Sequence, residues 1–306
     1  MEFNQLEYVT EVADTGSFSK AAANLFYSQP ALTQQIGKLE KELGIQLFNR
    51  AHGSVSLTEA GSVFVQYAHD IINSKKEVLS AMNDFAQNRS GSITVLLPME
   101  RGSKMMAGFF PNFHKKFPGI VMNTIQTSVH RQLNRIGHGA ADLGFVLLND
   151  TSELDGIDYH CLSAEPFLFA ISRSNPLSFG AADSTTPTQE LPVCTPKLLS
   201  SVNYAMQQPF SSSYKLVMNF LTDLQISPNV MLYSNTNVSI LEFVKEDMAC
   251  GILPSWYRSF NDDIAYFRLP KDLSWSMYAI WKKGHYRTNA SFLTENLITD
   301  YLTTQN

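Results

Sequence analysis

The chain has 306 residues, of which 44% are hydrophobic and 17% are charged, and its formal net charge is −5 at pH 7. These values are ordinary for a globular protein of two or three domains, and the mildly acidic charge excludes a protein whose whole surface binds nucleic acid. Neither a run of about 18 apolar residues nor an apolar N-terminal signal region occurs, so we expect a cytoplasmic protein without membrane contact.

The three cysteines, Cys161, Cys194 and Cys250, are widely spaced and form no CxxC pair. This pattern predicts neither a disulfide framework nor a metal site. The chain also lacks a P-loop, a GxGxxG motif after a strand, an HExxH motif and a GxSxG motif, and its seven histidines are scattered. We therefore predict no catalytic residue, no metal and no cofactor, and we expect the protein not to be an enzyme.

The first 44 residues predict three helices. Apolar residues between 3 and 15 recur at helical spacing, and Gly16 ends that helix. Ser17 is a good N-cap for a short second helix that contains Phe18 and small alanines. A third helix follows a turn at residues 26–28. Helix, helix, turn, helix within about forty residues is the layout of a helix-turn-helix domain.

The third helix, at residues 28–44, has two different faces. Its apolar residues are spaced 4, 3 and 4 apart and predict one buried stripe: Leu32, Ile36, Leu39 and Leu43. The opposite face carries amide, hydroxyl and ammonium groups: Pro30, Thr33, Gln34, Gly37, Lys38 and Lys41. Such a face can lie against base edges, so we interpret this segment as a DNA recognition helix. An ordinary amphipathic surface helix is the alternative.

Residues 45–58 contain two short alternating runs around a Gly-containing turn, a pattern that predicts a β-hairpin. Beside a helix-turn-helix, a hairpin is a wing. Arg50 and His52 lie in it and are candidates for contact with phosphate or the minor groove. A solvated turn is the alternative, and it applies to His52 more than to Arg50.

A long helix is predicted from Thr58 to about residue 87. Its apolar residues repeat with spacings of 3 and 4 over more than three heptads, which is typical of a seam between two helices. The predicted seam residues are Phe64, Ala68, Ile71, Val78, Met82 and Phe85. Lys75 also falls in the seam. We favour a two-helix contact between copies of the chain over a core helix within one chain.

The periodicity changes beyond the polar segment 87–92, which marks a domain boundary. Strands predicted near 93–97, 120–127 and 143–148 alternate with helices near 103–116 and 129–137, as in βαβ units with a parallel sheet. The mixed pattern continues to the C-terminus. About 215 residues of α/β structure are enough for two small subdomains that share a cleft.

In such domains ligands bind at the carboxyl ends of strands and at helix N-termini. The loop 99–103 follows the first strand, so Ser103 is a candidate cap and anion contact, and Arg101 a candidate carboxylate clamp. A plain cap and a solvated charge are the respective alternatives, and Glu100 either favours an amine or neutralises Arg101. The predicted effector-binding residues are Glu100, Arg101, Ser103, Thr127, Ser128, Gln207, Asn235 and Thr236.

Over its first 61 residues the chain resembles the LysR-type transcriptional regulators. The specific motifs are Ser28-Gln29-Pro30-Ala31-Leu32-Thr33-Gln34-Gln35-Ile36, Leu43-Gly44, Leu47-Phe48, Arg50 and Leu57-Thr58-Glu59-Ala60-Gly61, with Gly16, Ser17 and Phe18 before them. The likeness continues more loosely through Phe110-Pro111, Phe117-Pro118, Ala141-Asp142-Leu143, Asn175-Pro176-Leu177 and Gly251-Ile252-Leu253-Pro254.

The resemblance implies a mostly α winged helix-turn-helix domain at residues 1–58 and a dimerisation linker helix at 59–88. It also implies a periplasmic-binding-protein-like α/β effector domain at 91–306. Subdomain I of this domain would comprise about 91–163 and 266–306, and subdomain II about 164–265. The chain would cross between them near 164–166 and near 265–266.

The resemblance further implies that Ser28, Gln29, Pro30, Thr33, Gln34 and Lys38 face the major groove of double-stranded promoter DNA, with Arg50 on the wing. A small-molecule effector and other copies of the chain, in a dimer or tetramer, would be the further partners, and contact with RNA polymerase stays open. Residues 1–90 carry seven Lys and Arg against ten Asp and Glu, so the usual basic footprint is missing. A solute-binding protein and a redox-sensing regulator are the alternatives.

Overall fold

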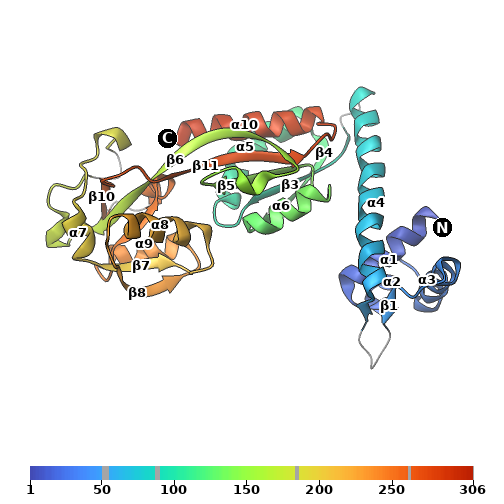
Figure 1. The fold of residues 1–306 in the computed structure, drawn as a ribbon. Coiled ribbons are helices and arrows are strands. Elements are labelled where there is room, and N and C mark those ends of the chain that lie inside the picture. Colours follow the sequence, from blue (N-terminus) through green and yellow to red (C-terminus); the bar gives the residue numbers. More distant parts are fainter. Residues whose placement is uncertain (50–54, 87–89, 183–185, 261–262, 306) are drawn as a thin grey trace.

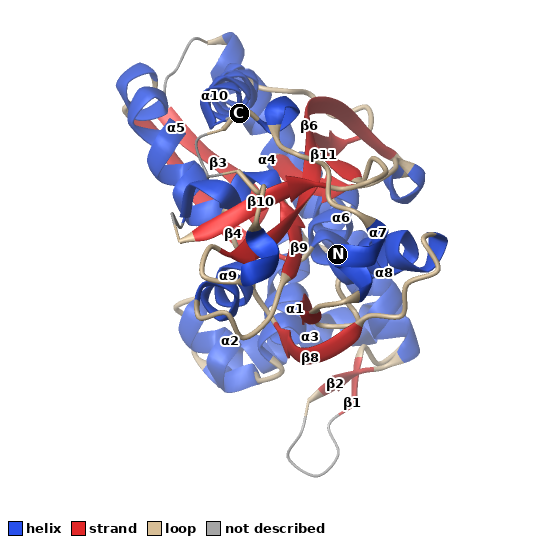
Figure 2. Cartoon of the chain, turned by 90° about the vertical axis from the view of Figure 1, so that its left-hand side faces the viewer, coloured by secondary structure: helices blue, strands red, loops and turns tan. Residues whose placement is uncertain are grey.

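The computed structural model describes residues 1–49, 55–86, 90–182, 186–260 and 263–305. Figure 1 shows a small N-terminal domain at one end of a long helix, α4, and a two-lobed α/β domain joined to the other end. The second view shows the strands of the α/β domain flanked by helices, whereas the N-terminal domain is helical apart from short β1 and β2 (Figure 2). The chain thus follows the predicted order of helix-turn-helix, linker helix and α/β domain.

The N-terminal domain consists of α1 (Phe3–Thr15), α2 (Phe18–Asn24) and α3 (Gln29–Leu43). Leu32, Ile36 and Leu39 are fully buried and pack against α1 and α2, which confirms that part of the stripe. Leu43 is 41% exposed. The prediction that Leu43 is buried is wrong, because the buried stripe of α3 ends at Glu40, one turn earlier.

The predicted wing is present as β1 (Phe48–Asn49) and β2 (Ser56–Leu57), which pair antiparallel. The buried Glu40 carboxylate accepts hydrogen bonds from the backbone N–H groups of Leu47 at 2.8 Å and Phe48 at 3.3 Å. This contact fixes the start of the hairpin to α3. Arg50 and His52 lie outside the described residues.

The long helix α4 (Glu59–Phe85) begins at Thr58, whose hydroxyl accepts a hydrogen bond from Gly61 N at 2.9 Å. Of the predicted seam, Ala68 is buried and Phe64 half-buried against the N-terminal domain of the same chain. The prediction that Ala68 faces a second copy is therefore wrong, because α1 already covers it. The remaining seam residues are exposed: Ile71, Val78, Met82 and Phe85.

The first lobe contains β3 (Ser90–Pro98), β4 (Gly119–Thr127), β5 (Leu143–Leu148) and β11 (Ser274–Lys282), in the spatial order β4-β3-β5-β11. The first three are parallel, and β11 runs antiparallel to β5. The lobe also contains the helices α5 (Gly102–Lys116), α6 (Val129–Gly137) and α10 (Asn289–Gln305). Phe109, Phe113 and Phe145 are among its fully buried side chains.

The second lobe is joined to the first through one long strand, β6 (Ile157–Ser172). Residues 157–166 pair with β11, and later residues pair with β9 (Gly251–Pro254) and β10 (Ile264–Arg268). A parallel pair, β7 (Asn203–Gln207) and β8 (Asn229–Ser234), completes the strands. The helices of this lobe are α7 (Pro196–Ser200), α8 (Ser212–Asp223) and α9 (Asn237–Lys245).

The pairing of β6 locates both chain crossings. The strand that β6 pairs with changes directly after Pro166, from β11 to β9. Tyr266 pairs with Ala170 inside the second lobe, so the return crossing falls between Arg268 and Ser274 rather than at 265–266. The difference arises because β10 is a full strand of the second lobe.

Two glycines in helices give a matched test of this packing. A Cβ at Gly61 would lie 2.0 Å from the carbonyl oxygen of Leu47, whereas a Cβ at Gly37 would meet nothing within 4 Å. We expect Gly61→Ala to destabilise the protein by about 1–3 kcal/mol, because backbone atoms must move. Gly37→Ala should stabilise it by up to about 1 kcal/mol through helix propensity. Urea unfolding of both variants measures the difference, and equal midpoints would contradict the close contact.

Candidate DNA-binding face and effector site

The described DNA-binding candidates lie together on α3, from its N-cap to Lys38. Ser28 caps the helix, and its hydroxyl accepts a hydrogen bond from Ala31 N at 3.4 Å. Five of the six described candidates are exposed and Thr33 is half-buried: Ser28, Gln29, Pro30, Thr33, Gln34 and Lys38. The Gln29 side chain accepts a hydrogen bond from the Ser19 hydroxyl of α2 at 2.7 Å, which links the two helices at this face. The face is polar and carries little bulk at its centre.

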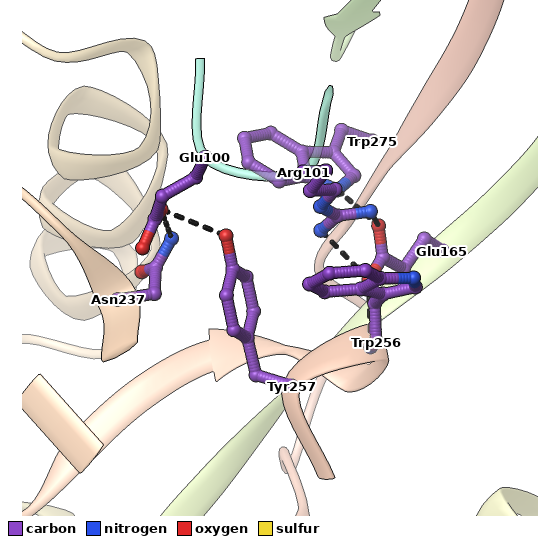
Figure 3. Close-up of polar contacts among 7 residues, drawn as sticks. All are labelled: Glu100, Arg101, Glu165, Asn237, Trp256, Tyr257 and Trp275. Carbon is purple, nitrogen blue, oxygen red and sulfur yellow. Dashed lines mark hydrogen bonds and ion pairs between the residues drawn. The ribbon is translucent and has the colours of Figure 1, made fainter. Parts of the chain in front are cut away.

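The second site is built around Arg101, in the loop between β3 and α5. Its guanidinium is 3% exposed and donates two hydrogen bonds to the Glu165 carboxylate, at 2.8 and 3.0 Å. Figure 3 shows this pair beside the rings of Trp256 and Trp275. The centre of the guanidinium lies 4.7 Å from the centroid of Trp256 and 5.7 Å from that of Trp275. Arg101 is therefore neither a solvated charge nor a free clamp for a ligand carboxylate.

Glu165 lies on β6 at the crossing between the lobes and is itself buried. Besides Arg101, it accepts hydrogen bonds from the backbone N–H of Trp256 at 2.7 Å and the indole N–H of Trp275 at 2.8 Å. Burial acts to lower the pKa of Arg101, but the Glu165 carboxylate and Tyr257 together outweigh it and the pKa is raised. The Arg101 guanidinium stays charged, and the hydrogen bonds of the pair join four segments that lie far apart in the sequence.

Glu100 points away from Arg101 and contacts the second lobe (Figure 3). Its carboxylate accepts hydrogen bonds from Val238 N at 3.1 Å, Asn237 Nδ2 at 2.9 Å and the Tyr257 hydroxyl at 2.7 Å. Asn237 and Val238 form the first turn of α9, where free N–H groups and the helix dipole favour an anion. A carboxylate of the first lobe thus occupies a helix N-terminus of the second.

Thr236 is the N-cap of α9, and its hydroxyl accepts a hydrogen bond from Ser239 N at 3.1 Å. Of the predicted effector residues, Thr236 and Glu100 are therefore brought to one place. Burial raises the pKa of Tyr257, so its hydroxyl is protonated and donates to Glu100. The hydrogen bonds of the Glu100 carboxylate come from three residues that sequence reasoning missed: Asn237, Val238 and Tyr257.

The other predicted effector residues lie at strand ends but take no part in this set of hydrogen bonds. Ser103 lies in the first turn of α5 rather than capping it, and its hydroxyl is hydrogen-bonded to the Gln126 amide at 2.8 Å. Thr127 is buried at the end of β4, and Ser128 follows as the exposed N-cap residue of α6. Gln207 and Asn235 lie at the carboxyl ends of the parallel strands β7 and β8.

Apart from those at the start of α9, the residues that sequence reasoning missed come from the two crossings and from the segment after β9, including Glu165, Trp256 and Trp275. A usable signal was present for one of them. Tyr257 follows a buried strand within three residues of its end, which is the position used above to select the other candidates.

The buried thiols do not fit a redox switch. Burial raises the pKa of Cys194 and of Cys250 to about 12, so neither is a reactive thiolate at neutral pH. Cys161 is exposed. Within the described ranges, no group of three or more His, Cys, Asp or Glu side chains is arranged to hold a metal ion. In the same ranges no helix is both long and apolar enough to cross a bilayer.

The α/β domain also contacts α4 directly. Glu77 accepts a hydrogen bond from Tyr286 N at 2.7 Å and lies 2.8 Å from His285 Nδ1. Seven residues further along α4, Asp84 accepts from the Tyr286 hydroxyl at 2.8 Å and from Asn289 N at 3.1 Å, at the start of α10. A cavity of about 420 Å³ lies beside these contacts, between α4 and the first lobe.

A winged helix-turn-helix, a long linker helix and a two-lobed α/β domain in one chain define a ligand-responsive DNA-binding regulator. Residues 3–62 match the family model described as bacterial regulatory helix-turn-helix protein, lysR family. Residues 86–293 match the model of the LysR substrate binding domain. The chain belongs to the LysR family of transcriptional regulators, a family of regulators rather than enzymes.

Individual relatives agree with this assignment. The chain is 32% identical over 173 residues to the uncharacterized HTH-type transcriptional regulator YcgK of Bacillus subtilis, a match that covers 56% of this chain and 53% of YcgK. It is 29% identical to the regulator BudR of Raoultella terrigena, over 64% of this chain and 68% of BudR. The matched region thus spans about half to two thirds of these relatives.

Solved structures show the same fold along the whole chain. Full-length CbnR complexed with its target DNA has a TM-score of 0.65 at 21% identity and covers 100% of both chains. A full-length OxyR variant from Pseudomonas aeruginosa has a TM-score of 0.72 at 19% identity, covering 97% of this chain and 94% of that one. At these identities the comparison establishes the fold alone.

The Arg101–Glu165 pair gives a direct test of this site. Glu165→Gln keeps the shape of the side chain but leaves the buried guanidinium without a counter-charge, so we expect a loss of about 3–5 kcal/mol in the free energy of unfolding. The control is Glu153→Gln, at an exposed position in a 3₁₀ turn, which should change stability by less than about 0.5 kcal/mol. Chemical denaturation measures both, and an equal effect of the two substitutions would contradict the role of the pair.

Proposed function

We propose that this protein is a cytoplasmic bacterial transcription factor that binds double-stranded promoter DNA through α3 and responds to a small molecule bound between the two lobes. The observation that carries the proposal is the polar face of α3 between Ser28 and Lys38, which is largely exposed while the opposite stripe is buried. It acts by binding and not by catalysis. The family membership established above supports this function, and whole-protein partners are part of the proposal.

The DNA contact is local, because the domain around it is not basic. Six candidate residues of α3 supply hydroxyl, amide and ammonium groups, and the free N–H groups at the start of the helix favour a phosphate. Arg50 and His52 on the wing belong to the same proposal. Specificity then rests on base contacts more than on general attraction to phosphates.

Self-association is proposed through an exposed apolar stripe on α4, with a tetramer formed by further contacts between effector domains. Val63 and Tyr67 precede Ile71, Val78, Met82 and Phe85 on this stripe, and each of the six is more than 40% exposed. Spacings of 4 and 7 residues, with a final step of 3, place them on one side of the helix. In this stripe Val63 and Tyr67 stand in place of Phe64 and Ala68 of the predicted seam.

The effector is proposed to bind at the lobe boundary, among Glu100, Ser103, Thr127 and Ser128 of the first lobe and Gln207, Asn235 and Thr236 of the second. A change in the angle between the lobes would reach α4 through its contacts with residues 282–289. Effector binding then shifts the population between two arrangements of the DNA-binding domains. The buried thiols with raised pKa argue against the redox alternative, and the attached recognition helix against a solute-binding protein.

The DNA prediction is tested by footprinting the purified protein on the DNA immediately upstream of its own gene. We expect protection of an interrupted palindrome. Replacing Thr33 and Gln34 together by alanine should abolish it at wild-type concentrations, since each lost base contact costs about 1–3 kcal/mol. Gln66→Ala, at an exposed position on α4, is the matched control and should leave protection unchanged.

Absence of protection at low salt, with the wild-type protein folded, would overturn the proposed target. Protection that survives the double substitution would overturn α3 as the recognition helix. The same preparation then serves as the assay for an effector screen.

The dimer prediction is tested by placing a charge in the stripe on α4. Val78 is 59% exposed in the single chain. We expect Val78→Glu to shift the protein from dimer or tetramer toward smaller species in analytical ultracentrifugation, because two carboxylates would be buried in the interface. Asn83→Glu, at an exposed polar position on another side of the helix, is the control. An unchanged assembly in the Val78 variant would place the dimer contact elsewhere.

A further inference from the structure

The Glu100 carboxylate is bound as a ligand would be bound. Three donors converge on it from the second lobe: Val238 N, Asn237 Nδ2 and the Tyr257 hydroxyl. All three come from a helix start or from a buried ring, and none comes from the same lobe as Glu100. Amide N–H and hydroxyl groups at a helix N-terminus are the usual donors for a carboxylate.

A second observation points to a ligand at the same place. Asn237 is 2% exposed and its side-chain oxygen has no hydrogen-bond partner among the described residues, although its nitrogen is bound to Glu100. A buried acceptor without a donor costs free energy, so the arrangement with Glu100 leaves one group of this site unsatisfied. A ligand with an O–H or N–H group beside its carboxylate would satisfy all of these groups.

We propose that Glu100 is an internal ligand that occupies the carboxylate position of the effector site, and that the effector is a small carboxylic acid with a neighbouring hydroxyl or amino group. This proposal rests on the lobe boundary being the effector site. Glu100 and the effector carboxylate compete for the same three donors. In the free protein the hydrogen bonds of Glu100 therefore hold the lobes together. Effector binding breaks these bonds, and the effector carboxylate takes the place of Glu100.

The neighbouring Arg101 does not compete for this role. Its guanidinium is committed to Glu165 by two hydrogen bonds, and its approach to the Tyr257 ring, 5.2 Å from guanidinium centre to centroid, supports the ring that donates to Glu100. The carboxylate selectivity of the site thus comes from neutral donors and the α9 dipole. Such donors discriminate a carboxylate from an uncharged isostere without a dedicated cation.

The test is chemical rescue in the full-length protein. Glu100→Ala removes the internal carboxylate and leaves its donors in place. We expect sodium acetate to raise the Tm of this variant by a few degrees in a saturable way, since a ligand that binds only the folded state stabilises it. Sodium chloride at the same ionic strength should have no such effect, and acetate should not act saturably on the wild-type protein. Tryptophan fluorescence is a suitable readout because the Trp256 ring packs against the Tyr257 ring, with centroids 5.0 Å apart.

Glycolate tests the second part of the proposal, because it adds one hydroxyl group beside the carboxylate. It should saturate the Glu100→Ala variant at a concentration several-fold lower than acetate, and equal affinities would overturn the hydroxyl or amino requirement. Glu153→Ala is the control for loss of a carboxylate elsewhere. Glu100→Ser also removes the carboxylate at position 100 and replaces Glu100→Ala if the alanine variant does not fold. The same acetate response in wild type, Glu100→Ala and Glu153→Ala would overturn the internal-ligand proposal.

Failure of this proposal is separable from failure of the proposed function. Rescue by acetate together with DNA binding that no carboxylic acid alters would uphold the internal ligand and remove the lobe boundary as the regulatory site. If acetate does not rescue the variant but footprinting is normal, the internal-ligand proposal is overturned and the proposed DNA-binding function is upheld.

Discussion

The ion pair between Arg101 and Glu165 constrains the whole α/β domain. A buried charge is tolerated only when its partner and its hydrogen bonds are in place, and here those come from the loop after β3, from β6, from the segment after β9 and from the start of β11. Both chain crossings meet in this cluster. It therefore fixes how the two lobes are connected, because any register shift in β6 would leave a guanidinium or a carboxylate unpaired.

Two weaker contacts of one kind lie elsewhere in the structure. Glu100 lies at the N-terminus of α9 and joins the lobes, and Asp84 lies at the N-terminus of α10 and joins α4 to the first lobe. A carboxylate at a helix N-terminus contributes about 0.3–1 kcal/mol when exposed and up to about 2 kcal/mol when partly buried, as both are here. These contacts can therefore break and reform while the buried pair stays intact, which is the combination that a two-state regulator needs.

The sequence was informative where local periodicity decides structure. The buried face of α3, the hairpin after it and the βαβ order of the first lobe follow from spacing and turn residues, and the exposed candidates on α3 lie where the spacing places them. Arg101 shows the limit. Its partner is 64 residues away on a strand whose register is set by tertiary pairing, so no local pattern distinguishes a buried Arg101 from a solvated one. Asn237 and Tyr257 likewise contact Glu100 from segments distant in the sequence, although Tyr257 lies close enough to the end of β9 to have been a candidate.

The residues of helix α4 face three neighbours: α1, the effector domain and, by our proposal, a second copy of α4. A heptad pattern identifies apolar positions but not what covers them, and here α1 covers Ala68 while Val78 and Phe85 stay exposed. Three of the exposed apolar residues directly follow an acidic residue that contacts the effector domain: Ile71 follows Asp70, Val78 follows Glu77, and Phe85 follows Asp84. Successive residues point about 100° apart around a helix, so the effector-contacting face and the proposed dimer face are adjacent along three heptads. A rotation or shift of α4 driven by the effector domain must then change the geometry of the dimer contact, and with it the spacing of the two DNA-binding domains.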